Sequence, residues 1–244
     1  MSLLPSGSHP VGRLLRLPLR LVPPLKPMRI LLGPLAGRRW LSTAGTHGCW
    51  LGTYERELQR LFAALLRPGQ VVYDVGANVG FFTLLAAHLV GPQGHVVATE
   101  PLPRNLELLD AHLALNALAN VTVVRAALAD AIGTTRFATG GSPSMGHVSE
   151  GGDLEVPVTT IDALVASGQR PPDLIKMDIE GAEARALAGA ARTLARYRPI
   201  VLLSTHGWQQ HQACCSALEA LGYGIQLRRD GSSDGQYELL ARVT

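Results

Sequence analysis

The stretch Val71-Val-Tyr-Asp-Val-Gly-Ala-Asn-Val-Gly80 carries the strongest fold signal in this chain. Its first five residues are apolar or β-branched except Asp74, which is typical of a parallel strand covered on both faces. Gly76 and Gly80 permit a sharp turn that approaches a ligand closely, and residues 81–90 then predict an apolar helix. This succession of strand, glycine turn and helix predicts an α/β fold with a ligand-binding turn.

The ligand expected at this turn is S-adenosylmethionine rather than a dinucleotide. The fingerprint G-x-G-x-x-G is incomplete, because Asn78 and Phe81 occupy two of its glycine positions. A carboxylate at Asp74 would repel a pyrophosphate but favour sulfonium and ammonium groups. Glu100 follows the next apolar run, where its carboxylate can accept hydrogen bonds from ribose hydroxyls. The expected cofactor-binding residues are Asp74, Gly76, Ala77, Asn78, Gly80, Glu100 and Pro101. The alternative is an ordinary α/β turn with two capping acids.

Length and composition fit one large folded domain with an extension before it. The chain has 244 residues, of which 47% are hydrophobic and 17% charged, so a disordered chain is excluded. Residues 1–40 carry seven of the 22 basic residues and no acid. We therefore expect a basic, Pro/Leu-rich N-terminal extension over 1–45, solvated or loosely docked, and a folded domain over 46–244 without a nucleic-acid footprint.

Cysteine usage and hydropathy bear on the cellular setting. The three cysteines, Cys49, Cys214 and Cys215, form neither a disulfide framework nor a zinc-binding spacing, which favours a reducing cytoplasm. No uninterrupted apolar run is long enough to predict a transmembrane helix. The Arg-rich N-terminus also resembles a transit peptide, although its prolines weaken an amphipathic helix.

The remaining hydrophobic pattern alternates strands with helices. Strands are expected at 71–75, 95–100, 121–124, 173–178, 199–206, 224–228 and 236–243. Helices are expected at 55–66 with Thr53 as a possible N-cap, and at 81–90, 103–116, 182–196 and about 208–221. A short loop joins the last two strands, so one of them must run antiparallel. The pattern predicts a Rossmann-like, mostly parallel seven-stranded sheet with one antiparallel strand and helices on both faces.

A glycine-rich segment interrupts this alternation. Two further strands, 134–138 and 154–159, flank Gly140-Gly-Ser-Pro-Ser-Met-Gly146. Such a segment could be an active-site lid or a plain hairpin loop.

Four motifs together resemble the FkbM family of class I S-adenosylmethionine-dependent O-methyltransferases. They are Trp50-Leu-Gly-Thr-Tyr-Glu55, Val72-Tyr-Asp-Val-Gly-Ala-Asn-Val-Gly80, Glu100-Pro-Leu-Pro-Arg-Asn105 and Leu174-Ile-Lys-Met-Asp-Ile-Glu-Gly-Ala-Glu183. The resemblance extends from about residue 50 to residue 206 and implies that the domain over 46–244 is the methyltransferase domain. It implies further that the loop from Asp74 to Gly80 holds the methionine part of the cofactor and that Glu100 binds the ribose.

Acidic residues and a histidine follow two neighbouring strands of the expected sheet. Asp178 and Glu180 come directly after the strand 173–178, and His206 ends the next strand on the same edge. Transfer of a methyl group to an alcohol benefits from a base that accepts the hydroxyl proton, so these three residues are the catalytic candidates. Their convergence would also permit a divalent cation, which the sequence does not require. The alternatives are helix capping and a structural histidine.

Other polar residues are weaker candidates for the functional site. Glu183 is expected to cap a helix, and Lys176 to be a strand residue paired with an acid. Tyr54 and Glu55 are expected to pack and to begin a helix rather than to contact substrate. His147, in the glycine-rich segment, is a further candidate base.

These features predict an S-adenosylmethionine-dependent O-methyltransferase. The resemblance alone implies its acceptor, a hydroxyl of a sugar, glycan or secondary metabolite. Two other interpretations remain, a non-catalytic cofactor-binding or scaffold protein of the same fold and, less favoured, a nucleotide-dependent oxidoreductase. The oligomeric state is not predicted.

Overall fold

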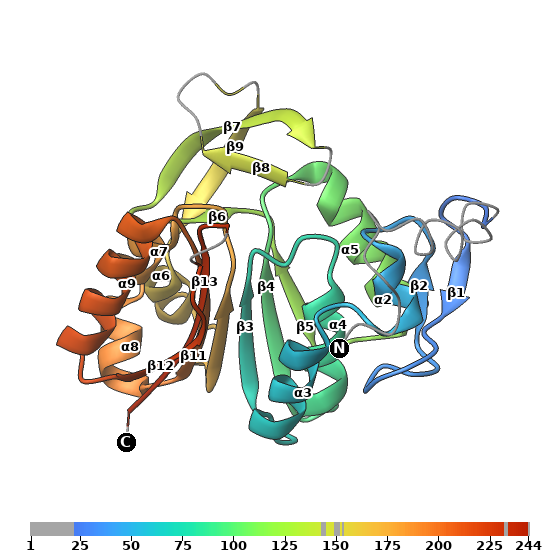
Figure 1. Ribbon diagram of the computed structural model, residues 1–244, viewed down its shortest axis with the longest axis horizontal. Helices are drawn as coiled ribbons and strands as arrows, with labels where there is room; N and C mark the ends of the chain where they lie inside the picture. Colours follow the sequence, from blue (N-terminus) through green and yellow to red (C-terminus); the bar gives the residue numbers. More distant parts are fainter. Residues whose placement is uncertain (1–21, 143–144, 149–151, 153, 232–233, 244) are drawn as a thin grey trace.

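A central seven-stranded sheet organises the molecule (Figure 1). The computed structural model describes residues 22–142, 145–148, 152, 154–231 and 234–243. The strand order is β12-β13-β11-β10-β3-β4-β5. The strands span β3 (Val71–Val75), β4 (His95–Thr99), β5 (Val121–Val124), β10 (Leu174–Met177), β11 (Ile200–His206), β12 (Gly224–Arg229) and β13 (Gln236–Arg242). Strand β13 runs antiparallel to both β11 and β12, and the other pairs are parallel, so the predicted mostly parallel sheet with one antiparallel strand is confirmed.

Helices cover both faces of this sheet, as the sequence predicts. They are α2 (His47–Leu51), α3 (Arg56–Leu65), α4 (Phe81–Val90), α5 (Pro103–Leu115), α6 (Ile161–Ala166), α7 (Glu183–Ala188), α8 (Ala191–Tyr197) and α9 (Trp208–Ala220). Helices α3 and α4 contribute to one hydrophobic core, and α6 to α9 contribute to the core on the opposite face. Alternate residues of β3 enter the two cores, because successive side chains of a strand point to opposite faces.

The chain reverses its direction of travel across the sheet beside β3. From β3 it proceeds outward to β4 and β5, and later strands add on the other side, starting with β10. Such a switch point leaves a crevice at the carboxyl ends of the two central strands, which is where open α/β sheets bind ligands. The glycine turn after Val75 and the acidic segment after Met177 both begin at this crevice.

Two predicted helix boundaries are wrong. The expected helix 182–196 is two helices, α7 and α8, which are separated at residues 189–190. The backbone of Gly189 packs there so closely on Ala129 that a Cβ would lie 2.0 Å from its carbonyl oxygen. Asp162 then caps α8 by accepting hydrogen bonds from the backbone N–H groups of Arg192 and Thr193. Thr53 does not cap α3, whose N-cap is Glu55.

The described part of the N-terminal extension is docked rather than loose. Strands β1 (Pro27–Arg29) and β2 (Arg39–Leu41) pair antiparallel, and Ile30, Leu35 and Trp40 are buried in the same core as α4. Trp40 stacks on His112 of α5 with ring centroids 3.6 Å apart. The expected solvated or loosely docked arm is therefore wrong for residues 27–45. The part of that expectation over 1–21 lies outside the described residues.

A second sheet of four strands lies above the carboxyl ends of the main strands (Figure 1). Its order is β6 (Ala127–Leu128), β9 (Leu154–Thr159), β7 (Gly133–Ser142) and β8 (Met145–Val148). The predicted strands 134–138 and 154–159 are thus present. Strands β7 and β8 pair antiparallel on either side of residues 143–144, which lie outside the described residues, and His147 is on β8. Among the described residues, no helix has the length and hydropathy needed to cross a membrane.

Candidate active site

A cavity of about 450 Å³ lies at the switch point of the sheet. This volume is in the range of small-molecule and cofactor sites. Its wall includes the residues after β3, β4 and β10, the segment that leads into α3, and the last two strands. Among the predicted site residues, it is lined by Gly76, Ala77, Asn78, Glu100, Pro101, Asp178 and Glu180. Asp74, Gly80 and His206 are not among the lining residues.

The glycine turn is fixed by its two neighbouring strands. Gly76 has a φ of 76°, and a Cβ there would lie 2.0 Å from the carbonyl oxygen of Asp178, so only glycine fits. The backbone N–H groups of Gly76 and Ala77 both donate to the carbonyl oxygen of Thr99, at 3.1 and 2.9 Å. The turn is thereby held between the ends of β4 and β10 and presents its backbone to the cavity.

Glu100 is a buried carboxylate that keeps acceptor capacity. It is 4% exposed, and its Oε1 accepts from the N–H of Leu102 at 3.0 Å and from Nδ2 of Asn105 at 3.1 Å. Its Oε2 accepts from the N–H of Asn78 at 2.9 Å. Burial raises the pKa of Glu100, although these hydrogen bonds oppose the rise. Since each carboxylate oxygen has two lone pairs, Oε2 retains one for a ligand hydroxyl.

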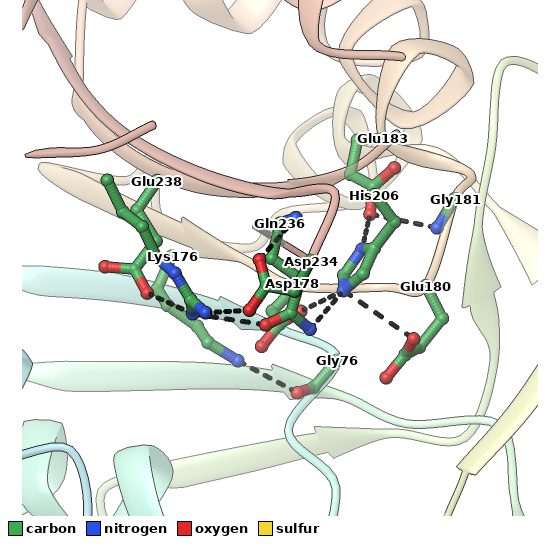
Figure 2. A network of polar contacts seen from close by, with 11 residues as sticks. Gly76, Lys176, Asp178, Glu180, Gly181, Glu183, His206, Asp234, Gln236 and Glu238 are labelled. Carbon is green, nitrogen blue, oxygen red and sulfur yellow. Dashed lines mark hydrogen bonds and ion pairs between the residues drawn. The ribbon is translucent and has the colours of Figure 1, made fainter. Parts of the chain in front are cut away.

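The buried side chain of Asp74 supports the glycine turn. Its carboxylate is fully buried, accepts from the hydroxyl of Thr83 at 2.6 Å and lies 3.4 Å from Nζ of Lys176. Lys176 also donates to the carbonyl oxygen of Gly76 at 3.0 Å, as Figure 2 shows. The predicted pairing of Lys176 with an acid is confirmed. Because Lys176 already neutralises Asp74, the geometry favours a role for Asp74 in shaping the turn over direct contact with a cation.

The charge of Lys176 is itself maintained by its surroundings. Burial alone would lower the pKa of this ammonium group, but the carboxylates of Asp74, Asp178 and Glu55 outweigh burial and raise the pKa above its ordinary value. Lys176 therefore stays protonated at neutral pH and cannot act as a base.

His206 lies at the centre of the acidic cluster at the ends of β10 and β11 (Figure 2). Its Nδ1 is 2.8 Å from Oε1 of the buried Glu183, and its Nε2 is 3.7 Å from Oδ1 of Asp178 and 3.6 Å from Oε2 of Glu180. The hydrogen bond with Glu183 raises the pKa of His206, burial opposes it, and the other two carboxylates add to the rise. The convergence of Asp178, Glu180 and His206 that the sequence suggests is thus present.

His206 contacts residues that line the cavity but does not line it itself. It stands behind Asp178 and Glu180, which line the cavity, and it is held by Glu183. Glu183 also accepts a hydrogen bond from the N–H of Gly181 at 3.0 Å, close to its expected capping function. Within the part of the chain that the structure describes, no group of three or more His, Cys, Asp and Glu side chains is arranged to hold a metal ion. We therefore assign no metal ligands.

Three lining residues adopt a strained backbone conformation. Glu55, Asn78 and Glu180 have φ values of 40°, 51° and 56°, in the left-handed region that side chains rarely adopt. Such strain is common at functional sites, where the surrounding structure maintains it. Glu55 begins α3 as its N-cap residue, as expected, but its side chain makes no capping hydrogen bond and lines the cavity.

Sequence reasoning missed the contribution of the last two strands. Arg229, Gln236 and Glu238 line the cavity, and Gln236 pairs with His206 in the register of β13 and β11. The sequence contains part of the signal that could have found these residues. The predicted hairpin places its second strand beside the strand that ends at 206, but the sequence does not give the register.

Comparison with known proteins identifies the domain. Residues 74–225 match the family described as Methyltransferase FkbM domain, which is more than half of the chain. The chain belongs to the FkbM methyltransferase family. The resemblance expected from the four sequence motifs is confirmed.

Two curated methyltransferases are moderately similar to this chain in sequence. The 31-O-demethyl-FK506 methyltransferase FkbM of Streptomyces tacrolimicus is 31% identical over 51% of this chain and 60% of that protein. The hexuronic acid methyltransferase AglP of Haloferax volcanii is 28% identical over 57% of this chain and 58% of that protein. The chain thus spans less than two thirds of the length of these curated relatives.

Solved structures share the fold of this FkbM domain. Methyltransferase FkbM from Methylobacillus flagellatus superposes with a TM-score of 0.53 at 19% identity, covering 80% of this chain and 53% of that one. A precorrin-6y C5,15-methyltransferase from Geobacter metallireducens gives a TM-score of 0.51 at 16% identity, covering 78% and 90%. Both similarities show the class I methyltransferase architecture.

Proposed function

We propose that this protein is an S-adenosylmethionine-dependent O-methyltransferase that methylates a hydroxyl group of a sugar, glycan or secondary metabolite. One observation carries the proposal. A single cavity joins the glycine turn and the open acceptor position of Glu100 to the carboxylates Asp178 and Glu180 on the other side of the switch point. The names of the two relatives, which specify a 31-O position and a hexuronic acid, support an oxygen acceptor.

The residues present fit the cofactor. The backbone of residues 76–78 borders the place for its methionine part, and Oε2 of Glu100 is positioned to accept a hydrogen bond from a ribose hydroxyl. Asp178, Glu180 and Glu55 give the cavity wall a negative charge, which favours a cationic ligand. When bound, the cofactor supplies an electrophilic methyl group on a sulfonium centre.

The proposed transfer forms a bond between the methyl carbon and the acceptor oxygen, breaks the bond from that carbon to sulfur, and releases the hydroxyl proton. Positioning supplies much of the acceleration, and a nearby carboxylate accepts the proton. Asp178, Glu180 and Glu55 all line the cavity and can reach an acceptor there. Burial raises the pKa of Glu55, which makes it a stronger base than an exposed carboxylate. His206 positions Asp178 and Glu180 and is not the base.

Three free cysteines among the described residues, two of them buried, support the cytoplasm as the proposed location. The proposed partners are a small-molecule or glycan acceptor and no nucleic acid.

Ligand-dependent thermal stabilisation tests the cofactor assignment. S-adenosylhomocysteine should raise the melting temperature of the protein, whereas NAD should not. Stabilisation by NAD alone would favour the oxidoreductase alternative and contradict the proposal.

A substitution at Glu100 locates the cofactor. In Glu100→Gln the amide cannot accept all the hydrogen bonds that the carboxylate accepts, so affinity for S-adenosylhomocysteine should fall by about 1 to 3 kcal/mol in a calorimetric titration. Glu107→Gln, on the exposed face of α5, is the matched control and should bind like wild type. Equal affinity of both variants would remove Glu100 from the cofactor site.

Turnover distinguishes an enzyme from a scaffold. Incubation with methyl-labelled cofactor and fractionated cell extract should label an acceptor, and Asp178→Asn should lower labelling while cofactor affinity is retained. Cofactor binding without labelling in any fraction would favour the non-catalytic alternative.

A further inference from the structure

The acceptor side of the cavity is rich in carboxylates. Glu55 enters from the segment before α3, Asp178 and Glu180 from the end of β10, and Glu238 from β13. We call these four residues the carboxylate wall. Glu55 ends the first of the four motifs that resemble the family, and Glu238 lies beyond residues 74–225, the part of the chain that matches the family model.

The cations in this cavity already have carboxylate partners. Among the described lining residues, the cationic ones are Lys176 and Arg229. Lys176 is paired with Asp74. Arg229 is paired with Asp234 and lies 3.7 Å from Glu238, and it also donates to Oε1 of Gln236. Neither cation is left to balance an additional anion.

The local charge stays negative under every protonation state of the histidine. His206 lies within 3.7 Å of Asp178 and Glu180 and is bound to Glu183, so a protonated His206 cancels one charge at most. Figure 2 shows Asp178, Glu180 and Glu183 gathered around His206. A sulfonium centre in the cofactor would offset one further charge. An anionic acceptor entering this cavity would therefore be repelled.

Hydroxyl groups are suitable hydrogen-bond donors to the carboxylate wall. A carboxylate accepts hydrogen bonds from hydroxyl donors, and two oxygens can take two neighbouring hydroxyls of one sugar ring. The side chain of Glu55 makes no helix-capping bond; it accepts a hydrogen bond from the hydroxyl of Tyr54 and lines the cavity. Beside the wall, Ser204 and Gln236 add neutral polar groups to the lining.

We propose that the acceptor is an uncharged, sugar-like polyol whose hydroxyl groups donate to the carboxylate wall, and that uronates and phosphorylated sugars are excluded. This inference rests on the proposed methyl transfer and defines the acceptor class of the same cavity. It narrows the acceptors that the O-methyltransferase proposal leaves open to those that carry hydroxyl groups and no negative charge.

Binding of a matched pair of sugars tests the inference. Affinity for S-adenosylhomocysteine is measured first, because its absence would refute the proposed function itself. The loaded protein is then titrated with methyl glucoside and with glucuronate by saturation-transfer NMR. Methyl glucoside should bind at least about tenfold more tightly, a difference of about 1.4 kcal/mol. Equal or tighter binding of glucuronate, or no binding of methyl glucoside, would overturn the acceptor class and leave the cofactor assignment intact.

Removal of negative charge from the carboxylate wall is the second test of the inference. The double variant Glu55→Gln and Glu238→Gln keeps side-chain size but removes two negative charges, so glucuronate affinity should rise by about tenfold. Glu219→Gln, on the exposed side of α9, removes a distant charge and should change neither affinity. Raising the salt concentration to about 0.5 M should narrow the preference in wild type, because the repulsion is screened. A preference that is unaffected by both charge removal and salt would refute the electrostatic origin.

Discussion

The buried ion pair between Asp74 and Lys176 predicts a large loss of stability in Lys176→Met. The substitution removes an ammonium group 3.4 Å from Oδ1 of Asp74 and 3.0 Å from the carbonyl oxygen of Gly76. The Asp74 side chain is 0% exposed, so its charge would remain in the core with a hydrogen bond from the hydroxyl of Thr83. Breaking a buried pair in this way costs about 3 to 5 kcal/mol. Because Lys176 itself retains 9% exposure, we expect a value near the lower end.

Urea denaturation measures this loss. With a slope of about 2 to 3 kcal/mol per molar urea, a cost of about 3 kcal/mol lowers the unfolding midpoint by about 1 M. Lys26→Met, at an exposed lysine in the N-terminal segment, is the matched control and should leave the midpoint nearly unchanged. The double variant Asp74→Asn with Lys176→Met removes both charges and should regain at least about 1 kcal/mol.

Two results would refute the reasoning about this pair. A shift below about 0.3 M for Lys176→Met would show that Asp74 is solvated or protonated rather than ion-paired. Additive effects of Asp74→Asn and Lys176→Met in the double-mutant cycle would show that the two groups are not coupled.

Three further predictions concern the core and the turn. Burial lowers the pKa of His112 to about 4, below its unfolded value of about 6.5. The folded protein should therefore be fully stable above pH 6.5 and lose about 3 kcal/mol as the pH falls toward 4. A urea midpoint that falls with pH no more steeply in the wild type than in His112→Gln would contradict this. Gly76→Ala should weaken S-adenosylhomocysteine binding by at least about tenfold in calorimetry, because its Cβ would meet the carbonyl oxygen of Asp178. Gly133→Ala, which has open space at an exposed position, is the control and should bind normally. Trp40→Ala should cost about 3 to 5 kcal/mol in the same urea assay, and a negligible cost would mean that the N-terminal segment is not part of the fold.

The sequence predicts the sheet because strand and helix signals are local. The apolar run Val71–Val75 and the glycine turn after it define a buried strand and a ligand loop without reference to the rest of the chain. The same holds for the short loop between the last two strands, which requires β13 to run antiparallel. Helix ends are less predictable, since contacts such as those of Asp162 with the first turn of α8 join residues about thirty positions apart.

Candidate cofactor residues follow from the sequence for a related reason. Residues at the carboxyl ends of neighbouring parallel strands share one edge, so Glu100 and Asp178 can be placed together from strand positions alone. The detailed roles of these residues cannot be derived from strand positions alone. The neutralisation of Asp74 by Lys176 is a contact across 102 positions, and it shifts the expected role of Asp74 from ligand contact to support of the turn.

The sequence by itself determined the α/β architecture, the cofactor turn and the family, because each depends on local periodicity and contiguous motifs. Only the tertiary structure decided that Glu55 and Glu238 face the same cavity as Asp178, and that residues 27–45 belong to the core. These features depend on strand order, register and packing between distant segments. Such long-range geometry sets the charge that an acceptor meets, and it leaves no local pattern in the sequence.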